Sequence, residues 1–263
     1  MNIKYKGRTR KIERGLTVRE ALAEEIKNSE YEVIGCLYNN DYRNLETQIE
    51  EGANIELIDI SSKEGMKIYV RTIVYIMGKA FESLYPKEKL MVEYQLGNAM
   101  YCKCDNIKIT KEFTEKLKQK MQEIIEKDLP IKKVEMTRKE AQKFYDETDT
   151  SKGRLQFDFE ENDPIYMYYC EKYYNYCFGT LANRTGVIKI FDVVKYANGF
   201  LIRYPSSKEP TQMPEFQETK KLAWALEEFE KIHSVLDVLT VYKLNKAIEE
   251  DRIKDVIMLA EAL

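Results

Sequence analysis

The residues that organise this chain are 71–86, RTIVYIMGKAFESLYP, in a sequence of 263 residues. Apolar side chains recur there three and four positions apart, which predicts a helix with one buried face. Pro86 ends the predicted helix, because a proline pushes the residue before it out of the helical region. Arg71 and Tyr75 are four residues apart near its start, so their side chains point the same way, one helical turn apart.

Composition excludes several classes of protein. The chain is 44% hydrophobic and 33% charged, so it can form apolar cores. Its net charge of -3 argues against a chain that binds nucleic acid over its whole surface by charge alone. No apolar run approaches the roughly twenty residues that cross a bilayer, and residues 1–15 lack the apolar core of a secretory signal. We therefore expect no membrane partner.

Cysteine, histidine and glycine usage narrows the chemistry. The five cysteines form neither an even disulfide set nor a Cys-x-x-Cys pair, which indicates a reducing cytoplasm. The single histidine, His233, excludes a multi-histidine zinc site and lies in a charged helical stretch where surface or interhelix packing is expected. None of the eleven glycines begins a phosphate-binding G-x-x-x-x-G-K-[ST] loop.

The first sixty residues predict a small α+β module. Residues 2–5 and 8–12 form a tight hairpin, and Thr17 with Glu20 three positions later predicts a capped helix. Residues 32–38 and 54–60 have the pattern of further strands. Two strands, a helix and further strands in this length are typical of a β-grasp arrangement.

This module resembles a TGS domain, the ubiquitin-like module at the front of threonyl-tRNA synthetase. Residues 15–22, GLTVREAL, match the helix entry of that family through Gly15 and Thr17. Residues 44–59, NLETQIEEGANIELID, match its glycine before the last strand. The resemblance implies an association with RNA or with nucleotide regulation.

The N-terminal hairpin is locally basic. Lys4, Lys6, Arg8 and Arg10 are candidate contacts for phosphate or RNA, because clustered cations bind phosphates without regard to sequence. The alternative is a solvated hairpin face that acidic residues just downstream, such as Glu20, balance. Charge runs usually lie on solvated surfaces, so we favour this alternative.

Residues 67–205 predict a second α+β domain. The predicted elements after the first helix are strands at 90–96, 99–104 and 131–136, helices that follow the capping residues Thr110 and Thr137, a loop at 146–153, a strand-like run at 165–176 and a hairpin at 188–204. The tyrosines of 166–176 favour ordinary sheet packing over a base-stacking platform, because tyrosine is a strong strand former.

This second domain resembles the editing domain shared by threonyl- and alanyl-tRNA synthetases. The matching order is GKAFESLYP at 78–86, then ITKEFTEKLKQKMQEIIEKDLPIKKVEMTRKEAQKFY at 109–145, then YYNYCFGTLANRTGVIKIFDVVKYANGFLIRY at 173–204. In that family a His-x-x-x-His helix and a Cys-x-x-x-His segment surround the hydrolytic site.

Four positions of this chain correspond to that hydrolytic site. The resemblance places Arg71 and Tyr75 at the two helix histidines, Cys177 at the cysteine and Leu181 at the last histidine. Zinc needs three or four nitrogen, sulfur or oxygen ligands, and one thiol beside the fixed positive charge of Arg71 does not supply them. No histidine stands near to act as a base. We therefore predict no catalytic residue, no metal site, no cofactor in this chain and no hydrolysis of aminoacyl-tRNA.

The altered cleft remains a candidate ligand site. Arg71, Tyr75 and Cys177 are its candidate ligand-binding residues, because arginine forks onto phosphate and tyrosine offers a stacking face. The alternative is that packing fills these positions, and the sequence weighs the two equally. Cys177 itself is expected to be a buried thiol rather than a nucleophile.

The tail widens the resemblance. Residues 206–214 predict a linker, and residues 215–239, 241–249 and 252–262 predict helices. Together with the two domains, LNKAIEEDRIKDVIMLAEAL at 244–263 resembles the front half of bacterial uridine kinase-like proteins, in which a P-loop kinase domain follows. That resemblance implies a parent protein that phosphorylates a nucleoside, with ATP and Mg bound only by the absent kinase domain.

We therefore expect an α+β chain with a TGS domain at 1–62, a degenerate editing-like domain at 63–205 and a helical connector at 206–263. The main hypothesis is a non-catalytic cytoplasmic regulatory region that binds a nucleotide or tRNA and partners its own C-terminal kinase domain. The alternative is a free-standing RNA-binding or editing-like protein related to threonyl-tRNA synthetase. The missing zinc ligands argue against the alternative, and the uncapped end at 263 favours the main hypothesis.

Overall fold

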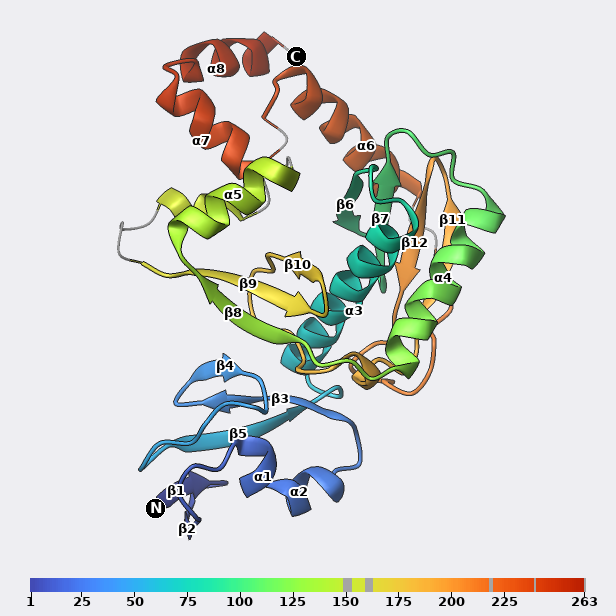
Figure 1. The fold of residues 1–263 in the computed structure, drawn as a ribbon. Coiled ribbons are helices and arrows are strands. Elements are labelled where there is room, and N and C mark those ends of the chain that lie inside the picture. Colours follow the sequence, from blue (N-terminus) through green and yellow to red (C-terminus); the bar gives the residue numbers. More distant parts are fainter. Residues whose placement is uncertain (149–152, 159–162, 218–219, 239, 263) are drawn as a thin grey trace. The chain divides into compact units, whose positions relative to one another are not determined.

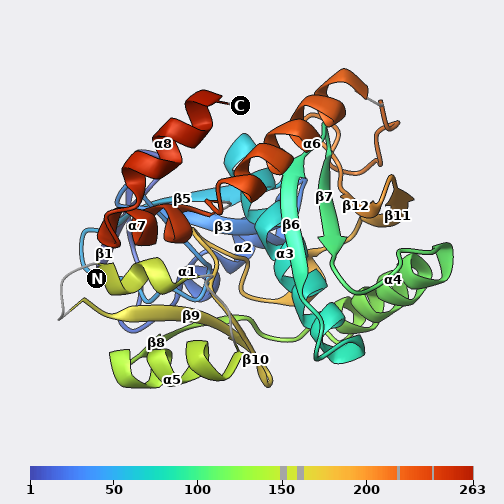
Figure 2. The same cartoon turned by 90° about the horizontal axis from the view of Figure 1, so that it is seen from above.

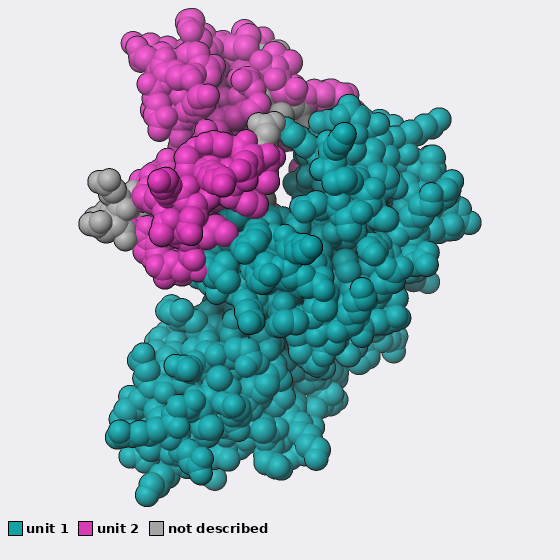
Figure 3. All heavy atoms as spheres, in the orientation of Figure 1, with its two compact units in different colours: residues 1–134, 167–216 teal, residues 135–166, 217–263 magenta. Residues whose placement is uncertain are grey.

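The computed structural model describes residues 1–148, 153–158, 163–217, 220–238 and 240–262. They fall into two compact units (Figure 3), one of Met1–Val134 with Met167–Phe216 and one of Glu135–Tyr166 with Gln217–Leu263. The elements mix helices and sheets, so the predicted α+β class is confirmed. The units group residues by packing, and the segment boundaries predicted at 62 and 205 stay predictions.

The first sixty residues form one mixed sheet in unit 1 (Figure 1). Its strands are β1 (Asn2–Tyr5), β2 (Arg8–Lys11), β3 (Val33–Tyr38), β4 (Asp41–Arg43) and β5 (Asn54–Asp59). The strand order is β2-β1-β5-β3-β4, with β1 parallel to β5 and the other neighbours antiparallel. Lys6 and Gly7 turn the predicted hairpin with φ of 48° and 74°, a region in which glycine meets no steric cost.

The helix predicted after Thr17 is present but short. The Thr17 hydroxyl accepts the N–H of Glu20 at 3.3 Å, and the Glu20 carboxylate accepts the N–H of Thr17 at 2.8 Å, so the capping box is confirmed. The two helical pieces are α1 (Val18–Ala21) and α2 (Ala23–Lys27), with Leu22 between them. Val18 and Leu22 are fully buried in the core of this sheet.

Helix α3 (Lys63–Leu84) contains the helix predicted from residue 71, and it begins earlier than predicted. Ser62 caps it, because its hydroxyl accepts the N–H of Gly65 at 3.0 Å. A Cβ on Gly65 would lie 1.8 Å from the carbonyl oxygen of Asp59, so glycine lets the helix start against the end of β5. Glycine weakens a helical pattern, which is why the sequence did not indicate this first turn.

A four-stranded sheet and two helices build the second core of unit 1. The strands are β6 (Leu90–Gln95), β7 (Ala99–Cys104), β11 (Asp192–Tyr196) and β12 (Gly199–Arg203), in the antiparallel order β11-β12-β7-β6. α3 and α4 (Lys111–Glu126), which Thr110 caps as predicted, cover one face of this sheet (Figures 1 and 2). Ile76, Leu117 and Phe200 are fully buried between these layers.

A third sheet contains the tyrosine-rich stretch. Its strands are β8 (Lys132–Met136), β9 (Ile165–Cys170) and β10 (Tyr173–Asn175), in the order β10-β9-β8. Tyr173 lies opposite Cys170, and Asn175 lies opposite Tyr168. Tyr168 and Tyr173 are buried, which confirms ordinary packing for these two tyrosines.

Unit 2 is helical. Its elements are α5 (Arg138–Thr148), the 3-10 turn η1 (Arg154–Asp158), α6 (Lys220–Val235), α7 (Val241–Glu249) and α8 (Ile253–Ala262). Thr137 and Glu140 form the predicted capping box. α5 runs into the loop predicted at 146–153, of which 149–152 lie outside the described residues. His233 is in α6, and its side chain is also outside the description. Among the described helices, none is long and apolar enough to cross a bilayer.

Candidate functional site

α3 carries two of the four positions that the resemblance assigns to the editing site. Tyr75 is 1% exposed, whereas Arg71, one turn earlier, is only partly buried. The Thr72 hydroxyl, fully buried on the same helix, accepts the N–H of Ala182 at 3.0 Å. This hydrogen bond holds the segment that contains Leu181 against α3.

A buried cluster surrounds Tyr75. Its buried members are Tyr75, Ile131, Tyr168, Cys170, Tyr173 and Leu181, and partly buried Cys177 packs against them. The ring centre of Tyr75 lies 5.1 Å from that of Tyr173 and 6.4 Å from that of Tyr168. Tyr75, Cys177 and Leu181 therefore meet in one place, although they come from segments about a hundred residues apart in the sequence.

Two hydroxyls of this cluster, those of Tyr75 and Tyr168, bond to the backbone. Tyr75 donates to the carbonyl of Tyr173 at 3.2 Å. Tyr168 donates to the carbonyl of Gly179 at 2.9 Å and accepts the N–H of Leu181 at 3.3 Å. Burial raises the pKa of both phenols, so both are protonated at neutral pH. Tyr75 thus fills space in this structure, and its role as a ligand contact stays a prediction.

Arg71 lies against the loop that follows Cys177. A Cβ on Gly179 would lie 3.0 Å from the guanidinium carbon of Arg71, and Gly179 has φ of 90°, which favours glycine. Within the described residues, the Arg71 guanidinium has neither a hydrogen bond nor an ion pair. Its charge acts to lower the pKa of Tyr168, against the larger effect of burial. Phe178, beside Gly179 in the chain, is 82% exposed.

The four converging positions do not fit a metal ion. In the part of the chain that the structure describes, no group of three or more His, Cys, Asp or Glu side chains is placed to hold one. Around Tyr75 the neighbours are phenols, thiols and aliphatic groups, and phenols with raised pKa are poor zinc ligands. The arrangement can therefore present a positive charge and aromatic surface.

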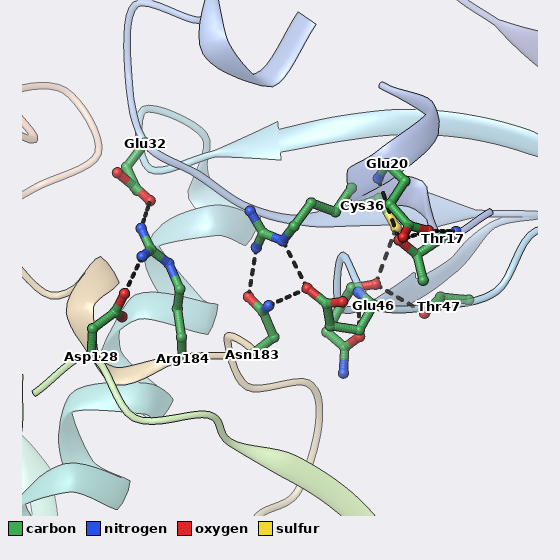
Figure 4. Close-up of polar contacts among 11 residues, drawn as sticks. Thr17, Glu20, Glu32, Cys36, Glu46, Thr47, Asp128, Asn183 and Arg184 are labelled. Atoms are coloured by element: carbon green, nitrogen blue, oxygen red, sulfur yellow. Dashed lines mark hydrogen bonds and ion pairs between the residues drawn. The ribbon is translucent and has the colours of Figure 1, made fainter. Parts of the chain in front are cut away.

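A polar network joins the first sheet to the second core of unit 1 (Figure 4). Arg19 donates through Nε to the Glu46 carboxylate at 2.7 Å and through a terminal nitrogen to Asn183 Oδ1 at 3.0 Å. The Asn183 amide in turn donates to the same Glu46 oxygen at 2.6 Å. The three side chains form a closed triangle, with Asn183 only 8% exposed.

Arg184 makes a second junction next to this triangle. It pairs with Asp128 and, at 3.4 Å, with Glu32, and Figure 4 shows its guanidinium between the two carboxylates. The Asp128 carboxylate also accepts the N–H of Gly186 at 3.0 Å. The end of α4 and the segment 184–186 are thereby fixed to each other and, through Glu32, to the first sheet.

A cleft of about 900 Å³ lies beside these junctions, wholly within unit 1. Arg19 and residues of the segment 44–47 line it from the first sheet. Asn183, Arg184 and residues of the segment 128–133 line it from the other side. The sequence did not indicate this cleft, because its walls come from segments that only the fold brings together.

The basic hairpin is exposed, as the alternative of a solvated face predicts. Lys4, Lys6, Arg8 and Arg10 all lie on its surface. Arg10 pairs with Glu25, a residue of the acidic stretch downstream. A cavity of about 630 Å³ beside Lys6 is lined by four carboxylates, those of Glu24, Glu25, Glu56 and Asp59. These carboxylates oppose a phosphate near Lys6, and the predicted phosphate contacts of the hairpin remain untested.

Comparison with known proteins places the chain beside one class of enzyme. No protein-family profile matches it. The threonine–tRNA ligase of Caldanaerobacter subterraneus subsp. tengcongensis is 28% identical over 196 residues, 74% of this chain and 30% of the ligase. The ligase of Clostridium tetani is 27% identical over 203 residues, 76% of this chain and 32% of the ligase. That of Thermotoga petrophila is 28% identical over 208 residues, with the same two shares.

This chain is therefore similar to part of a threonine–tRNA ligase. It spans about a third of the length of these curated relatives. The similarity supports the predicted resemblance to threonyl-tRNA synthetase and the alternative hypothesis of an editing-like or RNA-binding protein. It gives no support to the uridine kinase parent, to a kinase domain as partner, or to the ATP and Mg that such a domain would bind.

Proposed function

We propose that this chain is an RNA-binding, editing-like region related to threonine–tRNA ligases, and that it binds tRNA without hydrolysing aminoacyl-tRNA. The observation that carries the proposal is the meeting of Tyr75, Cys177 and Leu181 in one cluster, with Arg71 beside it. These are the positions that the resemblance assigns to the hydrolytic site. The proximity of these residues supports a shared site, in which three of the four side chains differ in chemical kind from those of the family.

The side chains argue for binding rather than hydrolysis. Hydrolysis needs a group that takes a proton from water or a metal that lowers the pKa of that water. The Tyr75 phenol has a raised pKa and an engaged hydroxyl, and Leu181 has no polar atom. Arg71 keeps a permanent positive charge, and a guanidinium binds phosphate by paired N–H groups. A phosphate near the 3′ end of tRNA is the ligand that suits it.

The first sheet supports the same assignment. Its order, β2-β1-β5-β3-β4 with a parallel β1–β5 pair and a helix packed on the sheet, is the arrangement expected of a β-grasp TGS domain. A TGS module beside an editing-like domain is the order that threonyl-tRNA synthetase would have. No observation favours a nucleoside kinase, and the proposal does not include one.

An equilibrium titration of fluorescently labelled bulk tRNA tests the proposal. We expect the wild-type chain to bind with an affinity that falls as salt rises, because phosphate contacts release counterions. Arg71→Ala should weaken binding about tenfold, which is the effect of losing one charge-assisted hydrogen-bonded contact. Arg252→Ala is the matched control, since Arg252 is a partly buried arginine of unit 2, as Arg71 is of unit 1, and pairs with Glu250.

Two outcomes of this titration would contradict the proposal in part or in full. Equal affinity of the wild type and Arg71→Ala would remove Arg71 from the site. Absence of any tRNA binding at low salt would overturn the proposed function itself. Unchanged thermal melting of both variants shows that the comparison reports binding and not folding.

A further inference from the structure

The cleft beside the Arg19–Glu46–Asn183 triangle has an excess of positive charge. Its lining contains four basic side chains, Arg19, Lys132, Lys133 and Arg184, against two carboxylates, those of Glu46 and Asp128. The carboxylates already pair with the two arginines. Lys132 and Lys133 of β8 lie at the same opening, so the lining carries two more basic side chains than carboxylates. An anion is the ligand that this balance favours.

The walls of the cleft are rigid. Thr185 accepts the N–H of Leu129 at 2.8 Å and donates to the carbonyl of Ile124 at 2.8 Å. The N–H of Ile131 donates to the carbonyl of Asn183 at 2.8 Å. These bonds tie the segments that carry Arg184 and the β8 lysines to the end of α4. Charged groups held in this way lose little freedom when a ligand binds.

The side chains that line the cleft also indicate which kind of anion it suits. None of the described side chains that line the cleft is aromatic, so it offers no face on which a base could stack. Instead Asn44, Thr47, Asn183 and the two carboxylates add hydrogen-bonding groups to the cations. Cations suit a phosphate, and amide or carboxylate oxygens accept hydrogen bonds from sugar hydroxyls. This combination suits a phosphorylated ribose read without regard to its base.

We infer that the cleft between the segments 44–47 and 128–133 binds a ribose-phosphate group, with Lys132 and Lys133 on the phosphate and Glu46 and Asn183 at the sugar hydroxyls. The inference rests on the proposed function and extends it. It adds a contact to the sugar-phosphate backbone of the RNA, at a place separate from Arg71 and from the basic hairpin. The phosphate can come from an RNA strand or from a free sugar phosphate.

The charge environment of Lys133 agrees with this assignment. Burial, and then the positive charge of Arg43, lower the pKa of Lys133 from its ordinary value. A lysine whose neighbouring cation destabilises its charged form gains from an anion placed between them. Bound phosphate should therefore raise the pKa of Lys133 again.

The test removes the lysine charges and follows RNA binding. We use the double variant Lys132→Gln with Lys133→Gln, and titrate a fluorescein-labelled oligouridylate by anisotropy over a range of salt. The variant should bind about tenfold more weakly than wild type at moderate salt. The slope of log affinity against log salt should become shallower by about 0.7 for each phosphate contact that is lost. The matched oligodeoxyuridylate should bind wild type more weakly, because it lacks the 2′-hydroxyl.

The control variant removes the same number of lysine charges at a place away from the cleft. Lys111→Gln with Lys116→Gln removes two exposed charges at the start of α4. Residue 116 lies about 18 Å from Asp128 at 1.5 Å per helical residue, which is well beyond the Debye length at physiological salt. This variant should bind RNA as the wild type does. Melting curves of both double variants exclude unfolding as the cause.

Ribose 5-phosphate at millimolar concentration separates this inference from the proposed function. If RNA binds wild type and the Lys132 and Lys133 variant equally, the inference is wrong and the proposed function stands. If RNA does not bind but ribose 5-phosphate raises the melting temperature of wild type and not of the variant, the inference holds with a free sugar phosphate as source, and the proposed function fails. If neither ligand binds, the inference is overturned.

Discussion

Gly186 and Asp128 are residues far apart in the sequence that depend on each other in the fold. Asp128 follows α4 with φ of 48°, and its carboxylate accepts the N–H of Gly186. A Cβ on Gly186 would lie 2.3 Å from that carboxylate oxygen, which is closer than any tolerated contact. The hydrogen bond, the Arg184 ion pair and one edge of the cleft therefore all require glycine at this position.

Gly186→Ala tests this dependence. We expect the free energy of unfolding in urea to fall by about 1–3 kcal/mol, because the added methyl group forces the Asp128 side chain to move. The double variant Gly186→Ala with Asp128→Ala removes the clash, so its loss should be smaller than the sum of the two single losses. Strict additivity would show that the two residues do not interact.

Single residues also show what the sequence could not reveal about the site. The sequence predicted that three of the four editing positions had lost their ligands and that Cys177 keeps the cysteine, and in the structure Tyr75, Cys177 and Leu181 lie in one cluster. It did not indicate that Tyr168 and Tyr173 fill the space beside Tyr75, since both faces of that strand carry tyrosines. The position of the Arg71 guanidinium against Gly179 follows from the path of a loop, which no local sequence pattern encodes.

At the scale of elements, local chemistry predicted most helix entries. Thr17, Thr110 and Thr137 cap the helices that the sequence assigned to them, because a cap is a contact between residues three positions apart. The start of α3 and the break after α1 were missed. Both depend on packing against other elements. α3 begins against the end of β5, and the side chain of Leu22 is buried in the core of the first sheet.

The cap of α4 gives a prediction at this scale. The Thr110 hydroxyl accepts the N–H of Phe113 at 3.2 Å, and α4 is a main layer of the second core. Thr110→Ala should lower the free energy of unfolding by about 1 kcal/mol, whereas Thr110→Ser should keep most of it, since serine caps as well as threonine. Equal losses for alanine and serine would show that the cap contributes through its methyl group instead.

At the scale of the whole molecule, buried ionisable groups set an alkaline limit to stability. Burial raises the pKa of Cys36, Tyr69, Cys104 and Tyr204 to about 12 each, from ordinary values of 9.0 for cysteine and 10.0 for tyrosine. Above pH 9 the unfolded chain loses these protons while the folded chain keeps them. The stability they contribute is therefore complete below about pH 9 and declines as the pH rises toward 12.

Urea unfolding at successive pH values measures this decline. The midpoint should be nearly constant from pH 7 to about 9 and should then fall with each further pH unit. Cys36→Ala removes one of the four groups and should make the fall shallower. A midpoint that stays level up to pH 11 would mean that these groups are open to water in the folded chain.

The cleft was the least predictable feature of the candidate site, because it depends on the fold of the whole chain. The cleft forms where the loop of the first sheet, the end of α4 and the segment after Leu181 meet. Local sequence patterns describe each of these segments but not their meeting. Similarity to threonine–tRNA ligases extends over about three quarters of the chain and is consistent with all of these parts. The kinase parent was inferred from the two domains together with the tail, whose described residues form α6, α7 and α8, and the similarity to threonine–tRNA ligases gives it no support.

One measurement tests the central claim most directly. Radiolabelled aminoacyl-tRNA is titrated with excess chain, the bound tRNA is recovered, and the fraction that still carries its amino acid is followed over time. The account predicts that tRNA is bound and that its aminoacyl bond decays no faster than in buffer, because the Tyr75 phenol is protonated with its hydroxyl engaged and Leu181 has no polar atom. Bound tRNA that loses its amino acid faster in the presence of the chain, and not with Arg71→Ala, would contradict it.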